Sequence, residues 1–323
     1  MLTLSSRRLR LLGALALAAW FTPQVSSAQG AAPASFSAAT QTAQQAPACK
    51  ALGDFYWEIG DARGVLGSGT IGSSYGPDKT IKMASASKWV FGAYFLQKIG
   101  NAQPSAQQVE ELEMKSGRSS FNPVKCVFTR KVEGCLNAGS NAEVKAQDVG
   151  KFSYGGGHSQ KLAIDLGLGG LSTDELTHEI MGTLGIGGLS YGHPQLAGGL
   201  EGPPSAYAAF LRKVVSGQLR MKQFLGYAPV CTLPGSCPNA TYSPAKAAWH
   251  YSLDHWIEDD PNNFGDGAFS SPGAFGFYPW IAADKSTYGL LAREKISATS
   301  YLDSVNCGVR IRKAWFSKQP VLQ

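Results

Sequence analysis

The sequence predicts an α+β protein whose antiparallel sheet is formed from both chain ends, is flanked by helices and receives an inserted, mostly helical domain. Alternating extended segments occur at residues 53–72 and again after residue 240. Between them, helical segments separated by glycine-rich loops fill residues 85–240. Cys49 and Cys307 lie near the two ends of the chain, which such a sheet would bring together.

The first 28 residues are typical of a secretory signal peptide. A head with three arginines precedes the apolar stretch 11–21, and the small residues Ser26-Ser27-Ala28 predict cleavage after Ala28. A membrane anchor is disfavoured because a spanning helix needs roughly 20 apolar residues. We therefore expect a periplasmic or extracellular protein, exported by the Sec or the twin-arginine route. Residues 29–47, rich in Ala, Ser and Gln, are predicted to be a disordered leader.

Length and charge exclude some classes of protein. The chain of 323 residues has a net charge of +6, and removal of residues 1–28, with three arginines and no acid, leaves +3 (6 − 3). This weak positive charge does not suggest a nucleic-acid partner. The remaining length suits one large or two closely joined domains, and no later segment is apolar for long enough to span a membrane. The oligomeric state stays open.

All six cysteines follow the predicted signal peptide, which indicates disulfide bonds. Their spacing suggests that two pairs close short loops and that the pair near the chain ends forms the third: Cys126–Cys135, Cys231–Cys237 and Cys49–Cys307. No Cys or His pair has the spacing of a zinc site, so no metal is expected.

The elements follow in order along the chain. We expect a β-hairpin over 53–72, helices over 88–99 and 204–225, and strands over three later segments, 247–259, 273–283 and 287–294. The sheet domain is then 48–84 together with 241–323, and the inserted helical domain is 85–240.

Several serine motifs compete for a catalytic role. Ser74 and Ser190 each stand in a G-x-S-x-G pattern, but a turn or loop follows each, where a nucleophile elbow needs a helix. The G-x-G-x-x-G pattern at 67–72 also lacks its helix, so a phosphate site is disfavoured. The S-x-x-K pattern of Ser243 and Lys246 lies in a short turn.

Ser85 and Lys88 form a second S-x-x-K pattern, which opens an apolar helix. One helical turn places the two side chains on the same face. Burial disfavours a charged amine, so Lys88 could accept the proton of the serine hydroxyl. The helix N-terminus would favour a developing oxyanion. The alternative is that Ser85 only caps the helix.

Together with Ser85 and Lys88, the later motifs resemble the serine β-lactamase and penicillin-binding-protein superfamily, nearest to its class C and esterase branch. Tyr154-Gly155-Gly156 is similar to the Y-x-N motif, with glycine in place of asparagine. Residues 273–276 (Gly-Ala-Phe-Gly) resemble the end of the segment that begins with K-T-G, and 194–218 resemble the preceding loop and helix. The resemblance covers residues 50–315 and implies a β-lactamase-like fold with Ser85 as nucleophile and Lys88 and Tyr154 as base and acid.

Departures from the family pattern bear on the substrate. The positions of K-T-G hold Ala268-Phe269-Ser270, so no cation is there to receive a substrate carboxylate. With the asparagine also lost at Gly156, neutral esters or amides are expected. Ser270 or Ser271 would supply a substitute hydroxyl, and the backbone N–H groups of Ser85 and Ser271 would form the oxyanion hole.

Two histidines, His158 and His255, are candidates for a role in the site. His158 would line the site, four residues after Tyr154. Asp254 and His255 could imitate part of a catalytic triad, but adjacent residues of the expected strand face opposite sides.

The resemblance implies a serine hydrolase that cleaves an ester or amide through an acyl-enzyme without a cofactor, and the predicted signal peptide implies that it is secreted. A β-lactamase or D-alanyl-D-alanine peptidase, and a non-catalytic ligand-binding protein of the same fold, are the alternatives. An α/β-hydrolase that uses Ser74 or Ser190 is a further one.

Overall fold

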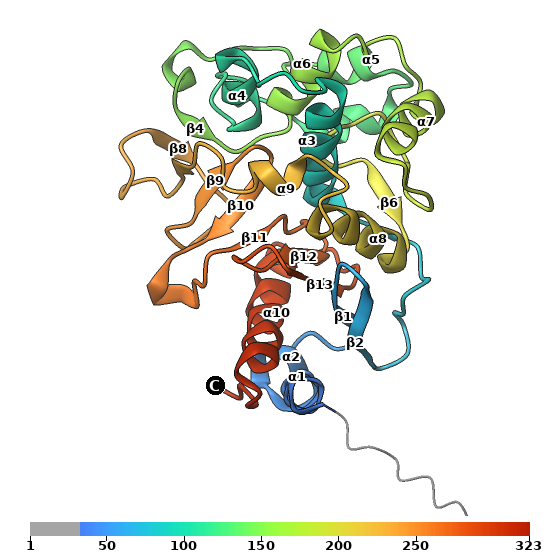
Figure 1. The fold of residues 1–323 in the computed structure, drawn as a ribbon. Coiled ribbons are helices and arrows are strands. Elements are labelled where there is room, and N and C mark those ends of the chain that lie inside the picture. The colour runs from blue at the N-terminus through green and yellow to red at the C-terminus, as the bar shows by residue number, and fades with distance from the viewer. Residues whose placement is uncertain (1–32) are drawn as a thin grey trace, which may run out of the picture. The chain divides into compact units, whose positions relative to one another are not determined.

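The computed structural model describes residues 33–323, so the predicted signal peptide, residues 1–28, lies outside the described residues. An eight-stranded antiparallel sheet with the order β2-β1-β13-β12-β11-β10-β9-β7 forms its centre (Figure 1). Its strands are β1 (Phe55–Asp61), β2 (Gly64–Ile71), β7 (Val230–Cys231), β9 (His250–Ser252), β10 (His255–Glu258), β11 (Ala268–Ser270), β12 (Tyr278–Ile281) and β13 (Thr287–Ala292). This is the antiparallel sheet that the sequence predicts.

The pairing of β1 with β13 joins the two ends of the chain, with Tyr56 opposite Ala292 and Asp61 opposite Thr287. Successive side chains of β1 point to opposite faces of the sheet. Trp57 and Ile59 enter the hydrophobic core on one face, and Tyr56 enters the core on the other. Both faces of the sheet are therefore covered.

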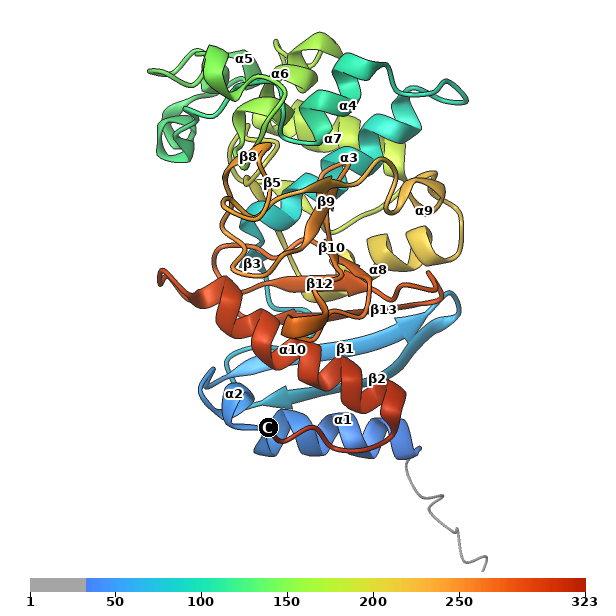
Figure 2. The ribbon, with the colours of Figure 1, turned by 90° about the vertical axis from the view of Figure 1, so that its left-hand side faces the viewer.

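The first face is covered by α1 (Ala34–Gln45), α2 (Pro47–Lys50) and α10 (Ser300–Ser317), and Figure 2 shows α1 and α10 side by side. The prediction of a disordered leader is therefore wrong for residues 34–45. Alanine is the best helix former, and its small side chain lets two helices approach closely. Ala38, Ala39 and Ala43 are buried in this way, so a composition typical of disorder here forms a packed helix.

The second face is covered by α8 (Pro204–Val215), which packs on β13 and β1. Because α8 lies on the sheet and β7 is its edge strand, the predicted domain 85–240 does not separate cleanly from the sheet. The remaining elements are α3 (Ser87–Lys98), α4 (Ala106–Leu112), α5 (Val132–Leu136), α6 (Gly157–Asp165), α7 (Thr173–Leu184), α9 (Met221–Phe224), β3 (Ile81–Lys82), β4 (Phe152–Ser153), β5 (Ser190–Tyr191), β6 (Leu200–Gly202), β8 (Ala240–Tyr242) and the 3₁₀ turns η1 (Ala84–Ala86), η2 (Pro123–Phe128), η3 (Ala146–Asp148) and η4 (Pro261–Asn263).

Two predicted elements are interrupted. The helix expected over 204–225 ends after Val215, because the chain turns at Gly217 with a φ of 78°, and α9 follows separately. The strand expected over 247–259 is a hairpin, β9 and β10, which turns at Asp254 with a φ of 63°. This turn brings Asp254 and His255 into the core.

Three disulfides link the predicted partners: Cys49–Cys307, Cys126–Cys135 and Cys231–Cys237. The first of them ties α2 to α10 and holds both ends of the chain on the same face of the sheet. None of the helices within residues 33–323 is long and apolar enough to cross a membrane.

Candidate active site

Ser85 and Lys88 lie at the start of α3, where η1 leads into the helix. The Lys88 amine nitrogen lies 3.1 Å from Ser85 Oγ and 3.1 Å from the carbonyl oxygen of Ala197. The lysine is 3% exposed, whereas Ser85 is partly exposed and lines a cleft. A buried amine therefore contacts a hydroxyl that a ligand can reach.

The turn that presents Ser85 is held by buried hydrogen bonds. Ala84 has a φ of 46°, a conformation that costs a residue with a side chain about 1–3 kcal/mol and that persists only where the surrounding structure holds it. Ser87 Oγ donates to the carbonyl of Ala84 and accepts the N–H of Leu200 (3.0 Å). The Tyr207 hydroxyl donates to the Ala86 carbonyl at 2.8 Å. These contacts fix the position of Ser85.

Tyr154 supplies a ring face beneath the lysine. The Lys88 amine lies 4.5 Å from the centre of the Tyr154 ring, and the ring stacks on Trp256 with centroids 5.3 Å apart. The backbone N–H of Tyr154 donates to the Tyr242 carbonyl at 3.0 Å, where β4 meets β8. Within residues 33–323 its hydroxyl makes no hydrogen bond, and the residue lines the same cleft as Ser85.

Gly156 occupies the place where the family pattern has asparagine. A Cβ atom at this position would lie only 2.6 Å from the ring of Phe121. Any side chain at residue 156 would therefore displace Phe121, whose ring takes up the space beside the backbone. Gly156 can offer a ligand no side-chain amide, in contrast to the asparagine of the pattern.

The opposite wall of the cleft is formed by the end of β11. Ser271 Oγ donates to the carbonyl of Ser85 at 3.1 Å, so the two walls are in contact. The Ser271 N–H, however, donates to the Pro279 carbonyl of β12 at 3.3 Å. This corrects the expectation that the N–H points into an oxyanion hole. The next residue, Pro272, lines the cleft and has no N–H to offer.

Two other predicted site residues are buried away from the cleft. Ser270 is fully buried, does not line the cleft, and its hydroxyl has no hydrogen-bond partner within the described chain. His158 is also fully buried, with Nδ1 2.7 Å from Ser116 Oγ and Nε2 3.0 Å from the Ser153 carbonyl. Burial lowers the pKa of His158 to about 4. Both predictions of a place in the site are wrong, and His158 serves as a neutral structural residue.

Asp254 and His255 lie in the core behind α3. His255 stacks on Trp89 with ring centroids 5.8 Å apart, and its Nε2 accepts the Gly226 N–H at 3.1 Å. Burial lowers its pKa to about 4 and raises the pKa of Asp254 well above its usual range. The Asp254 carboxyl accepts a hydrogen bond from Ser159 Oγ at 3.3 Å, and neither residue contacts Ser85. They do not form a triad with it.

Neither competing serine hydrogen-bonds to a lysine or histidine within residues 33–323. Ser74 Oγ donates to Asp54 at 2.6 Å, and Asp54 also accepts the N–H groups of Ser73 and Ser74. This cluster closes a turn next to β2. Ser190 is exposed on β5, and its hydroxyl makes no hydrogen bond within residues 33–323.

The cleft that holds Ser85 and Tyr154 has a volume of about 600 Å³. Aromatic side chains from several elements line it: Tyr242, Trp249, Trp256, Phe264 and Tyr301. Lys246 and Arg310 line it as well, and no carboxylate does among the described residues. No sequence motif pointed to the α10 side of this cleft, where Tyr301 and Arg310 lie, because the fold alone brings α10 to the cleft. No group of three His, Cys, Asp or Glu side chains in residues 33–323 is arranged to hold a metal.

No protein-family model matches the chain, and no curated protein matches its sequence. Solved structures do match. A protein from Bacteroides dorei, described as a β-lactamase, has a TM-score of 0.63 at 20% identity, over 81% of this chain and 93% of its own. The D-amino acid amidase of Ochrobactrum anthropi matches with a TM-score of 0.62 at 12% identity, over 87% of this chain and 98% of its own.

A third similar structure is EstCE1, described as a hydrolase with promiscuous acyltransferase activity. It has a TM-score of 0.61 at 10% identity, over 88% of this chain and 98% of its own. All three matches span nearly the whole of the other protein, so the likeness is to a complete fold. The chain therefore has the fold of the serine β-lactamase and penicillin-binding-protein superfamily.

Proposed function

We propose that the protein is a serine hydrolase that cleaves an ester or amide bond through an acyl-enzyme on Ser85. The observation that carries this proposal is the 3.1 Å contact between the buried Lys88 amine and Ser85 Oγ at the cleft. A serine hydroxyl is a weak nucleophile until a neighbouring base takes its proton. Within the described residues, Lys88 is the one base in contact with Ser85.

The contacts of Lys88 suit this role. As a neutral amine, Lys88 would donate one N–H to the Ala197 carbonyl and accept the O–H of Ser85. When Ser85 Oγ bonds to the substrate carbonyl carbon, its proton passes to Lys88, and the resulting cation faces the Tyr154 ring. Such a cation–π contact is worth ~2 kcal/mol when it is shielded from water.

The proton held by Lys88 then passes to the leaving alcohol or amine as its bond to the acyl carbon breaks, which completes the acyl-enzyme. The Tyr154 hydroxyl, on the same cleft, is a second group that can donate a proton to the leaving group. In the second half of the reaction, a water molecule gives a proton to Lys88 and attacks the acyl carbon. The free acid leaves, and Ser85 regains its hydroxyl proton.

Stabilisation of the oxyanion would rest mainly on the α3 wall. The first N–H groups of a helix have no intrahelical partner, and the helix end favours negative charge. The Ser85 N–H is therefore the first donor. The Ser271 N–H is held in the sheet, so the second donor of the predicted oxyanion hole is missing in this conformation.

The cleft suits a substrate with a bulky apolar or aromatic group, and its β11 wall offers no cation to a substrate carboxylate, whereas Lys246 and Arg310 line other parts of the cleft. The β11 wall holds Ala268, Phe269 and Ser270 where the family pattern has a cation and its neighbours. Aromatic rings on both sides of the cleft offer contact area to such a group. The amidase and hydrolase descriptions of similar structures agree with this substrate class. Three disulfides favour an oxidising location, which we propose to be the periplasm or the exterior of the cell.

The test is replacement of Ser85 and labelling of the nucleophile. Ser85→Ala should fold normally and lower kcat for an aromatic ester by about 10⁴-fold or more, whereas the controls Ser74→Ala and Ser190→Ala should retain it. A fluorophosphonate probe should modify Ser85, as located by peptide mass spectrometry. Full turnover by Ser85→Ala, or a probe bound elsewhere, would refute the proposal. Rapid hydrolysis of nitrocefin would instead favour a β-lactamase.

A further inference from the structure

A group of apolar side chains is exposed on η2 (Pro123–Phe128). Phe128 is 85% exposed, Val124 62% and Val127 54%. They belong to residues 122–131, which we call the η2 segment. Isolated exposed apolar residues are common on soluble proteins, but three within five positions form a patch that indicates an interaction site.

The backbone of the η2 segment presents these residues together. In a 3₁₀ helix, side chains three positions apart lie on the same face. Val124 and Val127 therefore share one face, Lys125 and Phe128 share the next, and Cys126 points inward, fully buried. The apolar side chains thus cover the outer faces of a short, rigid turn.

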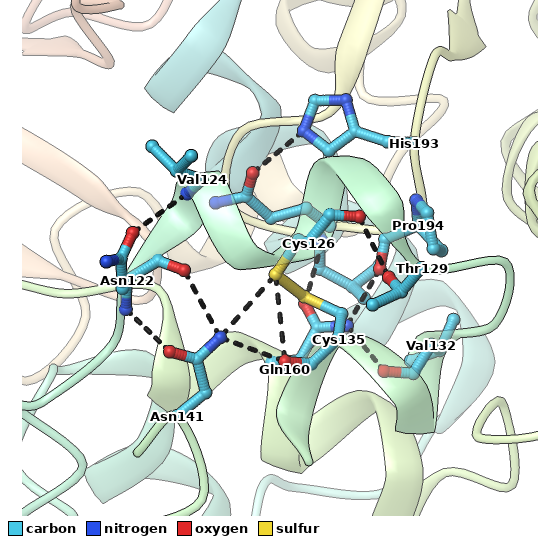
Figure 3. Close-up of a disulfide and its surroundings, with 12 residues drawn as sticks. Asn122, Val124, Cys126, Thr129, Val132, Cys135, Asn141, Gln160, His193 and Pro194 are labelled. Carbon is cyan, nitrogen blue, oxygen red and sulfur yellow. Dashed lines mark hydrogen bonds between the residues drawn. A yellow bond between two sulfur atoms is a disulfide. The ribbon is translucent and has the colours of Figure 1, made fainter. Parts of the chain in front are cut away.

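The η2 segment is also fixed from within, as Figure 3 shows. Cys126 is joined to Cys135 by a disulfide. The Asn141 side chain accepts the Asn122 N–H at 2.6 Å and donates to the carbonyls of Asn122 (3.2 Å) and Cys135 (2.9 Å). These bonds keep the segment from turning its apolar side chains inward.

Several basic residues belong to the η2 segment or lie close to it in the sequence. Residues 114–132 contain five basic residues and no acidic one. Three of the five, Lys125, Arg130 and Lys131, are exposed and make no ion pair within residues 33–323. The patch therefore combines apolar side chains with free cations.

We propose that the η2 segment docks the protein onto an anionic phospholipid surface, with Phe128 inserted among the acyl chains and the three cations at the headgroups. Apolar side chains beside cations are the chemistry of interfacial membrane binding. A soluble polyanion would satisfy the cations but leave Phe128 in water. A second copy of the chain would bring like charges against each other. The lipid surface satisfies both kinds of side chain.

The first test measures binding to vesicles of phosphatidylcholine with and without phosphatidylglycerol by co-sedimentation. Wild-type protein should bind the vesicles that contain phosphatidylglycerol. Phe128→Ser should weaken that binding on the order of 10-fold, because it removes the inserted ring. The matched control is Ile296→Ser, which removes an apolar side chain that is 83% exposed outside the η2 segment and should bind as wild type. Residues 1–32 are the same in every variant and contribute equally.

The second test removes charge. The triple variant Lys125→Gln, Arg130→Gln and Lys131→Gln should lose on the order of 100-fold in vesicle binding, because each cation at an anionic surface is worth about 1 kcal/mol. Its control changes the same charge outside the segment, with Lys50→Gln, Lys79→Gln and Lys295→Gln, three residues that are also exposed. Circular dichroism confirms that all variants are folded.

The outcomes separate the possible occupants. Binding that falls in Phe128→Ser and in the η2 triple variant, but in neither control, supports the proposal. Absence of wild-type binding, equal binding by Phe128→Ser, or equal binding to vesicles without phosphatidylglycerol overturns it. A dimer in analytical ultracentrifugation that Phe128→Ser dissociates would assign the patch to a second copy and also overturn the proposal.

Discussion

The two walls of the cleft differ in how many of the groups expected from the family pattern they contain. On the α3 wall, Ser85 and Lys88 are in contact, and buried hydrogen bonds hold the turn before them. On the β11 wall, the family cation is absent, the Ser271 N–H is bound within the sheet and Pro272 has no N–H. The walls meet through a single side-chain hydrogen bond from Ser271 to Ser85.

This difference shows that the proposed nucleophile and the proposed oxyanion site depend on different elements of the fold. The α3 wall needs only one turn of helix to bring its two residues together. The β11 wall depends on which backbone groups the neighbouring strands leave free. A chain can therefore keep the first wall while the second is remodelled for another substrate.

The largest effect is expected when Lys88, the proposed base on the α3 wall, is replaced. Lys88→Arg keeps a positive charge but cannot act as a neutral base. We expect kcat to fall by about 10⁴-fold, near the upper end of the usual contribution of a general base. Steady-state kinetics with an aromatic ester measures the loss. Lys82→Arg, an exposed neighbour on β3, is the control; near-normal turnover by Lys88→Arg would leave Ser85 without its proposed partner.

The second prediction separates the ring of Tyr154 from its hydroxyl. Tyr154→Phe keeps the ring face under the Lys88 amine and removes only the O–H. We expect kcat to fall by about 10²-fold, the lower end of the range for an acid–base group. Tyr154→Leu, which removes the ring as well, should lose more. Equal activity of Tyr154→Phe and wild type would show that the ring alone serves the reaction.

The third prediction tests how firmly the α3 wall is held from behind by His255. Its pKa is about 4 in the fold and 6.5 when unperturbed, so the unfolded state takes up a proton first as the pH falls. Stability is therefore lost between these two values, by about 2 kcal/mol from pH ~7 to pH ~5 for this residue. Urea unfolding of His255→Gln should show a pH dependence smaller by that amount.

His178→Gln, which changes an exposed histidine, is the control and should keep the wild-type pH dependence. The contribution of His158 to the stability of the fold also falls as the pH falls. Glu111, whose pKa burial raises to about 7, contributes more stability as the pH falls. Both groups remain in wild type and variant. An unchanged pH dependence in His255→Gln would mean that the imidazole is not held neutral.

The smallest effect concerns the β11 wall. Because the Ser271 N–H points to β12, the N–H of the next residue would face the opposite way, toward the β10 side of β11, where Trp256 and Pro272 line the cleft. Pro272→Ala restores such a donor, and we expect kcat/KM to rise about 10-fold, less than the 10²–10³ of an optimised oxyanion donor. Pro244→Ala, which changes another proline of the cleft lining, is the control. A fall in kcat/KM for Pro272→Ala alone would show that Pro272 shapes the wall instead.

The sequence predicted those features that depend on neighbouring residues. The hairpin over 53–72, the contact of Ser85 with Lys88 and the short disulfide loops all follow from local spacing. The direction of the Ser271 N–H could not be predicted, because it depends on the register of β11 against β12. The burial of His158 depends on Ser116 and Ser153, which the fold alone brings to it.

The segment predicted to be a disordered leader shows a different limit of prediction from the sequence. Residues 34–45 have a composition typical of disorder, yet they form α1 because α10 offers a surface on which alanines pack. That surface is made by residues at the other end of the chain. A prediction from local composition has no access to it.

The disulfide between Cys49 and Cys307 also sets the order of events during synthesis. It joins residues 258 positions apart, and β1 cannot pair with β13 before the C-terminal segments have been made. Contacts between residues so distant in sequence form slowly. The pairing of β1 with β13 must therefore wait until the C-terminal segments have been made, and the emerging chain lacks its complete sheet until then. A protease that cuts one exposed loop of the finished protein between the two cysteines leaves fragments that remain covalently joined.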